Sequence, residues 1–155
     1  MQNKTNHRRD CLKKTAAAGA SITLPCVYSP TNTLGAVTRE KNDRIPIGLI
    51  GAGGMGNGNM RAAKAWVDVV AIADVDQSRC DSTNQSLSNG KANTYQNYQQ
   101  ILDRDDIKVV HIATPDHWHT KPLIEAMYAG KDVYCEKPLT LTIDEGKLIR
   151  KVQKE

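Results

Sequence analysis

Residues 45–56 read Ile-Pro-Ile-Gly-Leu-Ile-Gly-Ala-Gly-Gly-Met-Gly, and residues 67–74 read Val-Asp-Val-Val-Ala-Ile-Ala-Asp. The two apolar runs predict buried strands, and the polar and apolar residues between them predict a helix. Gly51 permits a tight turn after the first strand, Gly53 lets backbone N–H groups approach a pyrophosphate, and Gly56 lets the helix pack close to the sheet. This is the strand–turn–helix–strand pattern of a dinucleotide-binding site. Glycine-rich turns are also common punctuation, so a structural turn beside an empty crevice is the alternative.

An acidic residue stands at the end of the second predicted strand. Asp74 lies close to the roughly 20-residue offset at which the ribose-binding acid is expected after the glycines. A carboxylate there accepts hydrogen bonds from the 2′ and 3′ hydroxyls of the ribose and repels a 2′-phosphate. Asp74 therefore predicts NAD as the cofactor. NADP is the less favoured alternative, because Arg79 follows one helical turn later and has the reach to bind a phosphate.

Beyond Asp74 the chain alternates predicted helices and strands, as a doubly wound sheet requires. The predicted elements are a helix over 77–87, a strand at 94–95, a helical turn over 97–102, a strand over 108–114, a helix over 117–129, a strand over 132–135 and a last helix from 143 to the end. The predicted fold class is therefore α/β, with a doubly wound parallel sheet of the Rossmann type. Ligands of such sheets bind beyond the carboxyl ends of the strands. The segments expected to converge there are 51–56, Asp74, 114–119 and 136–138.

Length and composition exclude several classes of protein. At 155 residues and 17.1 kDa the chain has room for one ordinary domain. The net charge of +4 is scattered, without a run of Lys and Arg interleaved with aromatic residues, which argues against nucleic-acid binding. No stretch approaches the roughly 18 to 20 apolar residues that span a bilayer. The four cysteines have neither the paired spacing of a metal site nor the density of a disulfide scaffold.

The start of the chain has the character of an export signal. The pair Arg8-Arg9 and the alanine-rich apolar segment over 15–24 resemble a twin-arginine signal, and a disordered basic tail is the alternative. We predict a signal and linker over 1–37 and a folded domain over 44–155. The resemblance implies the twin-arginine translocase as a partner, export in the folded state, and a periplasmic or extracellular location.

Three further motifs carry a specific resemblance. Residues 113–119 read Ala-Thr-Pro-Asp-His-Trp-His, residues 129–131 read Ala-Gly-Lys, and residues 136–138 read Glu-Lys-Pro. In this order after the glycines, they resemble the amino-terminal domain of the family of glucose-fructose oxidoreductase, inositol dehydrogenase and the rhizopine-catabolism proteins. The resemblance implies a nicotinamide-dependent oxidoreductase that acts on sugars, polyols or related hydroxy compounds. It also implies a larger α/β substrate domain that is absent from this chain, so we expect a fragment of a protein that forms homo-oligomers at full length.

The resemblance also assigns roles to single residues. Lys137 resembles the family lysine beside the nicotinamide and the substrate hydroxyl, and it is the catalytic candidate, because a lysine there donates a hydrogen bond to the reacting oxygen. Pro138 resembles the proline that fixes this turn, and Glu136 is expected to orient the lysine or to bind ribose hydroxyls. The complete set of expected cofactor-binding residues is Gly51, Gly53, Gly54, Met55, Gly56, Asp74, Thr114, Pro115, His119, Glu136, Lys137 and Pro138.

The segment over 114–119 resembles the family loop beside the cofactor ribose and nicotinamide, with Asp116 in place of the more usual Asn. We expect no metal site here. His117 and His119 are two residues apart, so on a helix they point to different faces, and no Cys or acid completes a ligand set. His111, within the fourth predicted strand, is interpreted as a packed or hydrogen-bonded core residue.

Two other functions remain open beside a sugar or polyol dehydrogenase. One is a glycosidase of the related NAD-dependent type, in which transient oxidation at a sugar carbon permits elimination and re-addition of water. The other is a non-catalytic NAD-binding module. The intact Glu-Lys-Pro motif at 136–138 favours the dehydrogenase.

Overall fold

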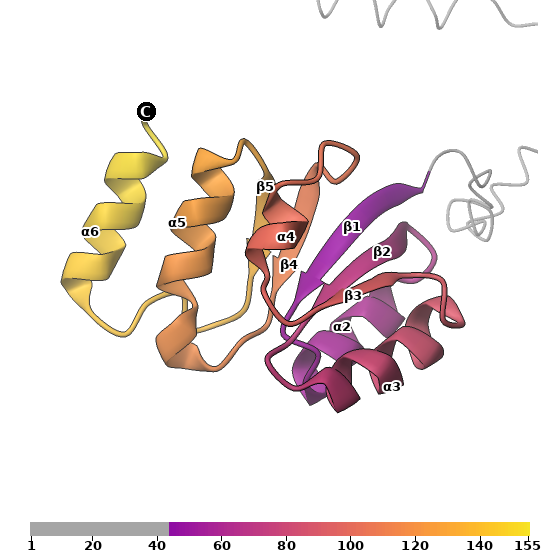
Figure 1. Ribbon diagram of the computed structural model, residues 1–155. Helices are drawn as coiled ribbons and strands as arrows, with labels where there is room; N and C mark the ends of the chain where they lie inside the picture. Colours follow the sequence, from indigo (N-terminus) through magenta and orange to yellow (C-terminus); the bar gives the residue numbers. More distant parts are fainter. Residues whose placement is uncertain (1–43) are drawn as a thin grey trace, which may run out of the picture. The chain divides into compact units, whose positions relative to one another are not determined.

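The computed structural model describes residues 44–155, which form a five-stranded parallel sheet with helices on both faces (Figure 1). The strands are β1 (Ile45–Ile50), β2 (Val67–Ala73), β3 (Asn93–Tyr95), β4 (Val109–Ile112) and β5 (Asp132–Cys135). The helices are α2 (Gly54–Ala63), α3 (Gln77–Ser88), α4 (Gln99–Leu102), α5 (Thr120–Tyr128) and α6 (Ile143–Val152), with a 3-10 turn, η3 (Asp116–Trp118). The predicted α/β fold is confirmed. The signal and linker predicted over 1–37 lie outside the described residues.

The strands are ordered β3-β2-β1-β4-β5, and every neighbouring pair is parallel. From β1 the chain winds outward through β2 to β3. It then crosses back to β4, beside β1, and continues outward to β5. The direction of winding therefore reverses between β1 and β4, and in doubly wound sheets this is where the ligand lies, outside the carboxyl ends of the strands.

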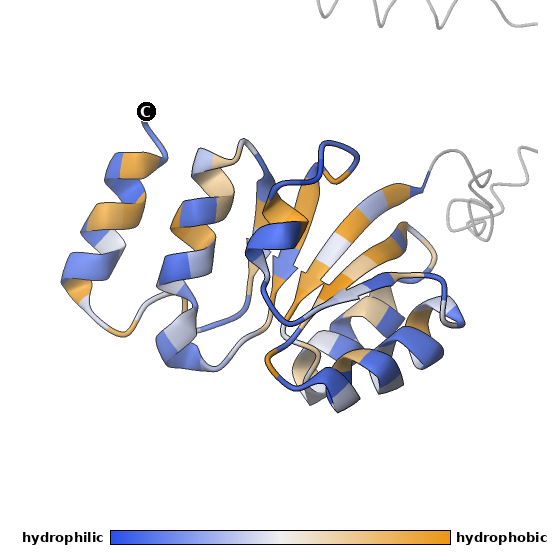
Figure 2. Cartoon of the chain, in the orientation of Figure 1, coloured by the Kyte–Doolittle hydropathy of each residue, from blue (hydrophilic) through white to orange (hydrophobic). Residues whose placement is uncertain are grey.

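Alternating side chains along the strands build two cores, one on each face of the sheet. Leu49 is fully buried on the face covered by α2 and α3, whereas its neighbour Ile50 is buried on the face covered by α4, α5 and α6. Figure 2 shows apolar strands between helices whose outer faces are polar. The first core contains Ile47, Leu49, Ala52, Met60, Ile72, Cys80 and Ala92. The second contains Ile50, Ala71, Ala73, Ile101, Leu102, Ile107, Val110, Ile112, Leu123, Ala126 and Ile149.

The turn between β1 and α2 can be made only with glycine at two positions. Gly51 has a φ of 98°, and a Cβ added to it would lie 2.6 Å from the backbone of Ala113. A Cβ added to Gly56 would lie 2.3 Å from the carbonyl oxygen of Gly51. Real Cβ atoms do not come this close to backbone, so α2 packs against the strand end as tightly as the sequence motif predicts.

The helix after β4 differs from the prediction. A helix was expected over 117–129, but the chain first makes the 3-10 turn η3, and α5 begins only at Thr120. Pro122 explains the late start. A proline lacks an N–H and its ring clashes with the carbonyl four residues earlier, so it is tolerated only in the first turn of a helix. A helix from 117 would place Pro122 beyond that turn, whereas α5 places it within the first turn.

Gly56→Ala is expected to lower the free energy of unfolding by about 1 to 3 kcal/mol, the usual cost of overpacking a close contact. Gly58→Ala is the matched control, because Gly58 lies in the same helix and an added Cβ would meet nothing within 4 Å. There the better helix propensity of alanine should raise the free energy of unfolding by up to about 1 kcal/mol. Urea denaturation measures both changes. Equal stability of the two variants would contradict the close contact of α2 with β1.

Candidate functional site

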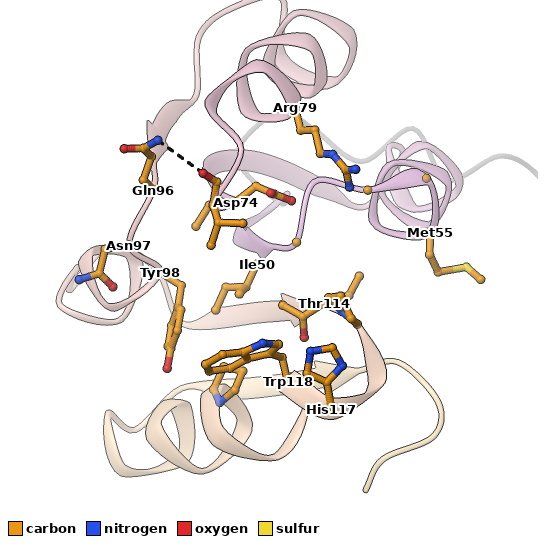
Figure 3. A pocket seen from close by; sticks show the side chains of 18 residues that line it. Ile50, Met55, Asp74, Arg79, Gln96, Asn97, Tyr98, Thr114, His117 and Trp118 are labelled. Carbon is orange, nitrogen blue, oxygen red and sulfur yellow. Dashed lines mark hydrogen bonds between the residues drawn. The ribbon is translucent and has the colours of Figure 1, made fainter. Parts of the chain in front are cut away.

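A pocket of about 550 Å³ opens at the carboxyl ends of β1, β2 and β4, where the winding of the sheet reverses (Figure 3). Seven of the predicted cofactor-binding residues line the pocket: Gly51, Gly53, Gly54, Met55, Asp74, Thr114 and Pro115. The other predicted residues, which lie outside its lining, are Gly56, His119, Glu136, Lys137 and Pro138. The glycine turn and the carboxyl ends of three strands therefore line one pocket. The Glu-Lys-Pro turn over 136–138 lies outside the lining of this pocket.

The glycine turn leaves room for an anion. A Cβ added to Gly54 would meet nothing within 4 Å, and one added to Gly53 would meet only Nη1 of Arg79, at 4.0 Å. Helix α2 begins here without an acidic residue in its first turn, so its unpaired N–H groups and the positive end of its dipole are available to a negative group. This arrangement fits a pyrophosphate, which can approach the backbone closely because no side chain intervenes. Arg79 adds positive charge beside it.

Asp74 ties the end of β2 to the glycine turn. Its Oδ2 accepts a hydrogen bond from the Ala52 N–H at 2.8 Å, and its Oδ1 accepts one from the Asp76 N–H at 3.0 Å. A carboxylate offers about four lone-pair directions, so acceptor capacity remains for the hydroxyls of a ribose. The acid expected to bind the ribose thus lies in the pocket and also holds the glycine turn in place.

Two aromatic side chains outside the predicted set also line the pocket. Tyr98 directly precedes α4, and Trp118 ends η3. Figure 3 shows both rings directed into the pocket. A flat base such as adenine is well suited to such rings, because aromatic faces stack. Trp118 lies in the segment 114–119 that was expected at this edge of the sheet. The position of Tyr98 in the segment after β3 is the sequence signal that could have identified it, since ligands of such sheets bind beyond the carboxyl ends of the strands.

Thr114 supplies a further polar atom to the pocket. Its Oγ1 is buried and has no hydrogen-bond partner in residues 44–155. Buried hydroxyls are almost always hydrogen-bonded, so this one fits a ligand that brings its own partner. Together with the open glycines and the ribose acid, it indicates that the pocket fits a dinucleotide.

His119 connects two loops. Its ring is buried, with Nδ1 lying 2.7 Å from the carbonyl oxygen of Pro138 and Nε2 lying 2.8 Å from the carbonyl oxygen of Thr114. Both distances are within hydrogen-bond range, and since a carbonyl oxygen only accepts, a ring with one N–H donates to one of the two oxygens and lies in contact with the other. The structure therefore places His119 outside the pocket lining, where it joins the loop after β4 to the turn after β5.

The Glu136–Pro138 turn is anchored beside β4. The Glu136 N–H donates to the carbonyl oxygen of Ile112 at 2.9 Å, and the Lys137–Pro138 peptide bond is cis. The side-chain amide of Asn59, in α2, donates to Glu136 Oε1. This hydrogen bond is the main reason that the pKa of Glu136 lies below its usual range. The exposed Lys137 thus follows a carboxylate that is ionised and oriented at neutral pH.

His111 is fully buried in β4, as expected of a core residue. Its ring packs against that of Tyr134, with the ring centres 5.0 Å apart, and its Nε2 lies 3.2 Å from the amide nitrogen of Asn59. Burial lowers the pKa of His111 below its ordinary value of 6.5, although the nearby charge of Glu136 opposes the shift. The ring is therefore neutral at pH 7 and can accept a hydrogen bond.

Three negative findings concern the described residues, 44–155. Among them, no three His, Cys, Asp or Glu side chains are grouped so that they could hold a metal ion. No helix in this part of the chain has the length and apolar character needed to cross a membrane. The two cysteines described, Cys80 and Cys135, are free thiols.

Comparison with known proteins identifies the family. The sequence pattern of the Gfo/Idh/MocA oxidoreductase family, with an NAD-binding Rossmann fold, matches residues 45–155. This chain belongs to that family. The resemblance carried by the glycine, Thr-Pro and Glu-Lys-Pro motifs is confirmed, and residues 45–155 match the NAD-binding Rossmann fold of the family.

Relatives with curated names and solved structures agree with this assignment. A glycosyl hydrolase family 109 protein of Shewanella pealeana is 34% identical over 145 residues, which cover 88% of this chain and 29% of the relative. A myo-inositol 2-dehydrogenase from Lactobacillus plantarum has a TM-score of 0.65 at 32% identity, over 72% of this chain and 33% of that one. A 3-ketoreductase from Actinomadura kijaniata in complex with NADP has a TM-score of 0.65 at 26% identity, over 72% and 36%. The chain spans about a third of the length of the curated relatives it matches.

Asp74→Ala is expected to weaken the binding of NAD more than that of NADP. The change removes the acceptor for the ribose hydroxyls and also removes the charge that repels a 2′-phosphate. We expect a loss of about tenfold for NAD, the size of one hydrogen bond to a charged group. Asp81→Ala is the control, because Asp81 is exposed on α3, where it accepts from Gln77 outside the pocket lining. Calorimetric titration with both cofactors measures the ratio, and an unchanged ratio in Asp74→Ala would contradict the ribose role.

Proposed function

We propose that residues 44–155 are the cofactor-binding part of an enzyme that transfers hydride between NAD and a carbon atom of a sugar, polyol or related hydroxy compound. The observation that carries the proposal is the pocket at the reversal of the sheet, where open glycines, a helix N-terminus and Asp74 occur together. The names of the solved relatives, an inositol dehydrogenase and a ketoreductase, support chemistry at a carbon that bears a hydroxyl or keto group.

The strand order supports an orientation for the cofactor. Asp74 directly follows β2, on one side of β1, and in the proposal binds the ribose of the adenosine half. The strands β4 and β5 lie on the other side of β1, so the nicotinamide half extends toward the Glu136–Pro138 turn. NAD bound in this orientation supplies the hydride acceptor. In the proposal, the Lys137 ammonium donates a hydrogen bond to the reacting oxygen of the substrate and stabilises its negative charge.

NAD is the proposed cofactor in preference to NADP. Arg79 is the cation that would favour a 2′-phosphate, but its guanidinium lies near Gly53, on the pyrophosphate side of the pocket. Its Nε also lies 3.5 Å from the carboxylate of Asp76. Asp74, by contrast, presents its carboxylate where the ribose hydroxyls are expected.

An NAD-dependent glycosidase is the second candidate, favoured by the name of the Shewanella pealeana relative. Such an enzyme uses the cofactor transiently and returns it unchanged, so the same pocket serves both activities. Net release of NADH during turnover of a sugar or polyol marks the dehydrogenase. Hydrolysis of a glycoside without net NADH marks the glycosidase.

We also propose that the protein is exported in the folded state by the twin-arginine translocase and acts in the periplasm or outside the cell. Support comes from Arg8 and Arg9, followed by the alanine-rich segment over 15–24. A route that carries folded proteins suits a domain that acquires its dinucleotide in the cytoplasm.

Trp118→Ala is expected to weaken NADH binding by about tenfold, because it removes a stacking surface for the base. The chain has two tryptophans, Trp66 and Trp118. Trp66 directly precedes β2, at the amino ends of the strands, whereas the pocket lies at their carboxyl ends. NADH should therefore quench the emission of Trp118 in the native protein and in the control Trp66→Phe, with equal affinity. Fluorescence titration measures both quantities. A native chain that shows neither quenching nor binding at millimolar NADH would contradict the proposed function.

Replacing both Arg8 and Arg9 by Lys is expected to retain the protein in the cytoplasm, because recognition of the signal depends on the arginine pair. Lys14→Arg, just outside the pair, is the control and should be exported normally. Cell fractionation with an antibody against residues 44–155 locates the protein. Unchanged export of the double variant would rule out the twin-arginine route.

A further inference from the structure

A hydrogen bond from Asn59, a residue outside the recognised motifs, helps to hold the Glu136–Pro138 turn in place. We propose that Asn59, in α2, is a positioning residue that sets Glu136 and, through it, the backbone of Lys137 beside the nicotinamide half of the cofactor. This inference rests on the proposed function, because it concerns how the same site is assembled.

The side-chain amide of Asn59 faces two acceptors. Its Nδ2 donates to Glu136 Oε1 and lies 3.2 Å from Nε2 of His111. An ionised carboxylate only accepts hydrogen bonds, so the nitrogen of the amide, and not its oxygen, must face Glu136. The second N–H of the same nitrogen then points to His111, whose Nε2 accepts it. Asn59 therefore bridges a carboxylate and a neutral imidazole.

His111 provides a rigid support for this bridge. Its ring is fully buried in β4 and packs against Tyr134. With Nε2 as the acceptor, the ring proton resides on Nδ1, a buried atom on the side of the ring that faces the backbone of Tyr134. The low pKa that burial imposes on the ring keeps Nε2 unprotonated at neutral pH, so the acceptor for Asn59 persists. The orientation of the amide is thus set by a central strand of the sheet.

The carboxylate of Glu136 links Asn59 to the backbone of Lys137. One carboxylate oxygen, Oε1, accepts from Asn59, and the other, Oε2, accepts from the backbone N–H of Lys137 at 3.3 Å. On the far side of Lys137, the carbonyl oxygen of Pro138 lies 2.7 Å from Nδ1 of His119. The lysine is therefore flanked by two anchored residues, and its exposed side chain starts from a fixed backbone.

Helix α2 joins the two functions of the site. Its first residues form the phosphate cradle, and Asn59 lies one turn further along the same helix. The position of the turn that carries Lys137 is consequently tied to the position of the pyrophosphate. Asn57 provides the contrast, because its amide donates to Thr83 Oγ1 at 2.6 Å and so joins α2 to α3, away from the turn.

The test compares the full 155-residue chain with the variants Asn59→Ala, Asn59→Asp and Asn57→Ala. Calorimetric titrations with NADH and with ADP-ribose separate the two halves of the cofactor, because ADP-ribose lacks the nicotinamide. For Asn59→Ala we expect NADH affinity to fall by about tenfold, as for one hydrogen bond to a charged group, while ADP-ribose affinity stays within about twofold. Asn59→Asp keeps the shape but sets a second carboxylate against Glu136, so NADH should bind more weakly still. Asn57→Ala should bind both ligands as the native chain does.

The outcomes separate the two hypotheses. A native chain that binds neither ligand contradicts the proposed function itself. Native binding of both ligands, with NADH affinity unchanged in Asn59→Ala and Asn59→Asp, overturns the positioning role alone. An equal loss of NADH and ADP-ribose in the Asn59 variants also overturns it, because a general structural defect would then be responsible.

A second readout does not require a ligand. The carboxyl resonance of Glu136, followed by NMR against pH, reports directly on the hydrogen bond from Asn59. The pKa of Glu136 should rise toward its ordinary value in Asn59→Ala and stay low in Asn57→Ala, because only the first variant loses the donor. An unchanged titration of Glu136 in Asn59→Ala would overturn the inference.

Discussion

The site depends on one close contact, between helix α2 and the turn that follows β1. The contact requires glycine at both ends, since a Cβ on Gly56 would lie 2.3 Å from the carbonyl oxygen of Gly51. With the helix this near, its N-terminus opens at the carboxyl ends of the strands, and Gly53 and Gly54 border the pocket. The next turn of the same helix brings Asn59 to Glu136, at the end of β5. One steric constraint therefore places both the open glycine turn and the hydrogen bond from Asn59 to Glu136, in the turn that carries Lys137.

The loops of the site are held by side chains that bond to the backbone of a neighbouring loop. Asp74 binds the N–H of Ala52 in the glycine turn, and His119 contacts the carbonyl oxygens of Thr114 and Pro138. Such cross-links give loop residues the fixed geometry that chemistry requires, because the bonds join segments that start from different strands. They also hold the turn over 136–138, which carries the exposed Lys137, against the loop after β4.

Much of this architecture could be predicted from the sequence, because its signals are local. The apolar runs predict the strands, and the fifth strand, Asp132–Cys135, has the predicted bounds. The glycine spacing predicts both the turn and the close helix. The contacts that join distant segments could not be predicted. Asn59 meets Glu136 across 77 positions of sequence, and Tyr98 lines the pocket from a segment that the sequence did not assign to the site. His119 was expected beside the cofactor on family resemblance, and its role as a connector depends on a turn that only the folded chain brings near.

The central claim is that a dinucleotide binds with its pyrophosphate over the glycine turn. The most direct measurement is an NMR titration of the isotope-labelled chain with NAD, followed through the backbone amide resonances. The largest shifts are expected at residues 52–56, with smaller ones at Asp74, Thr114 and the turn over 136–138. Shifts confined to the basic side chains of α6 and the residues after it, Lys147, Arg150, Lys151 and Lys154, would show only general attraction of an anion and would contradict the claim.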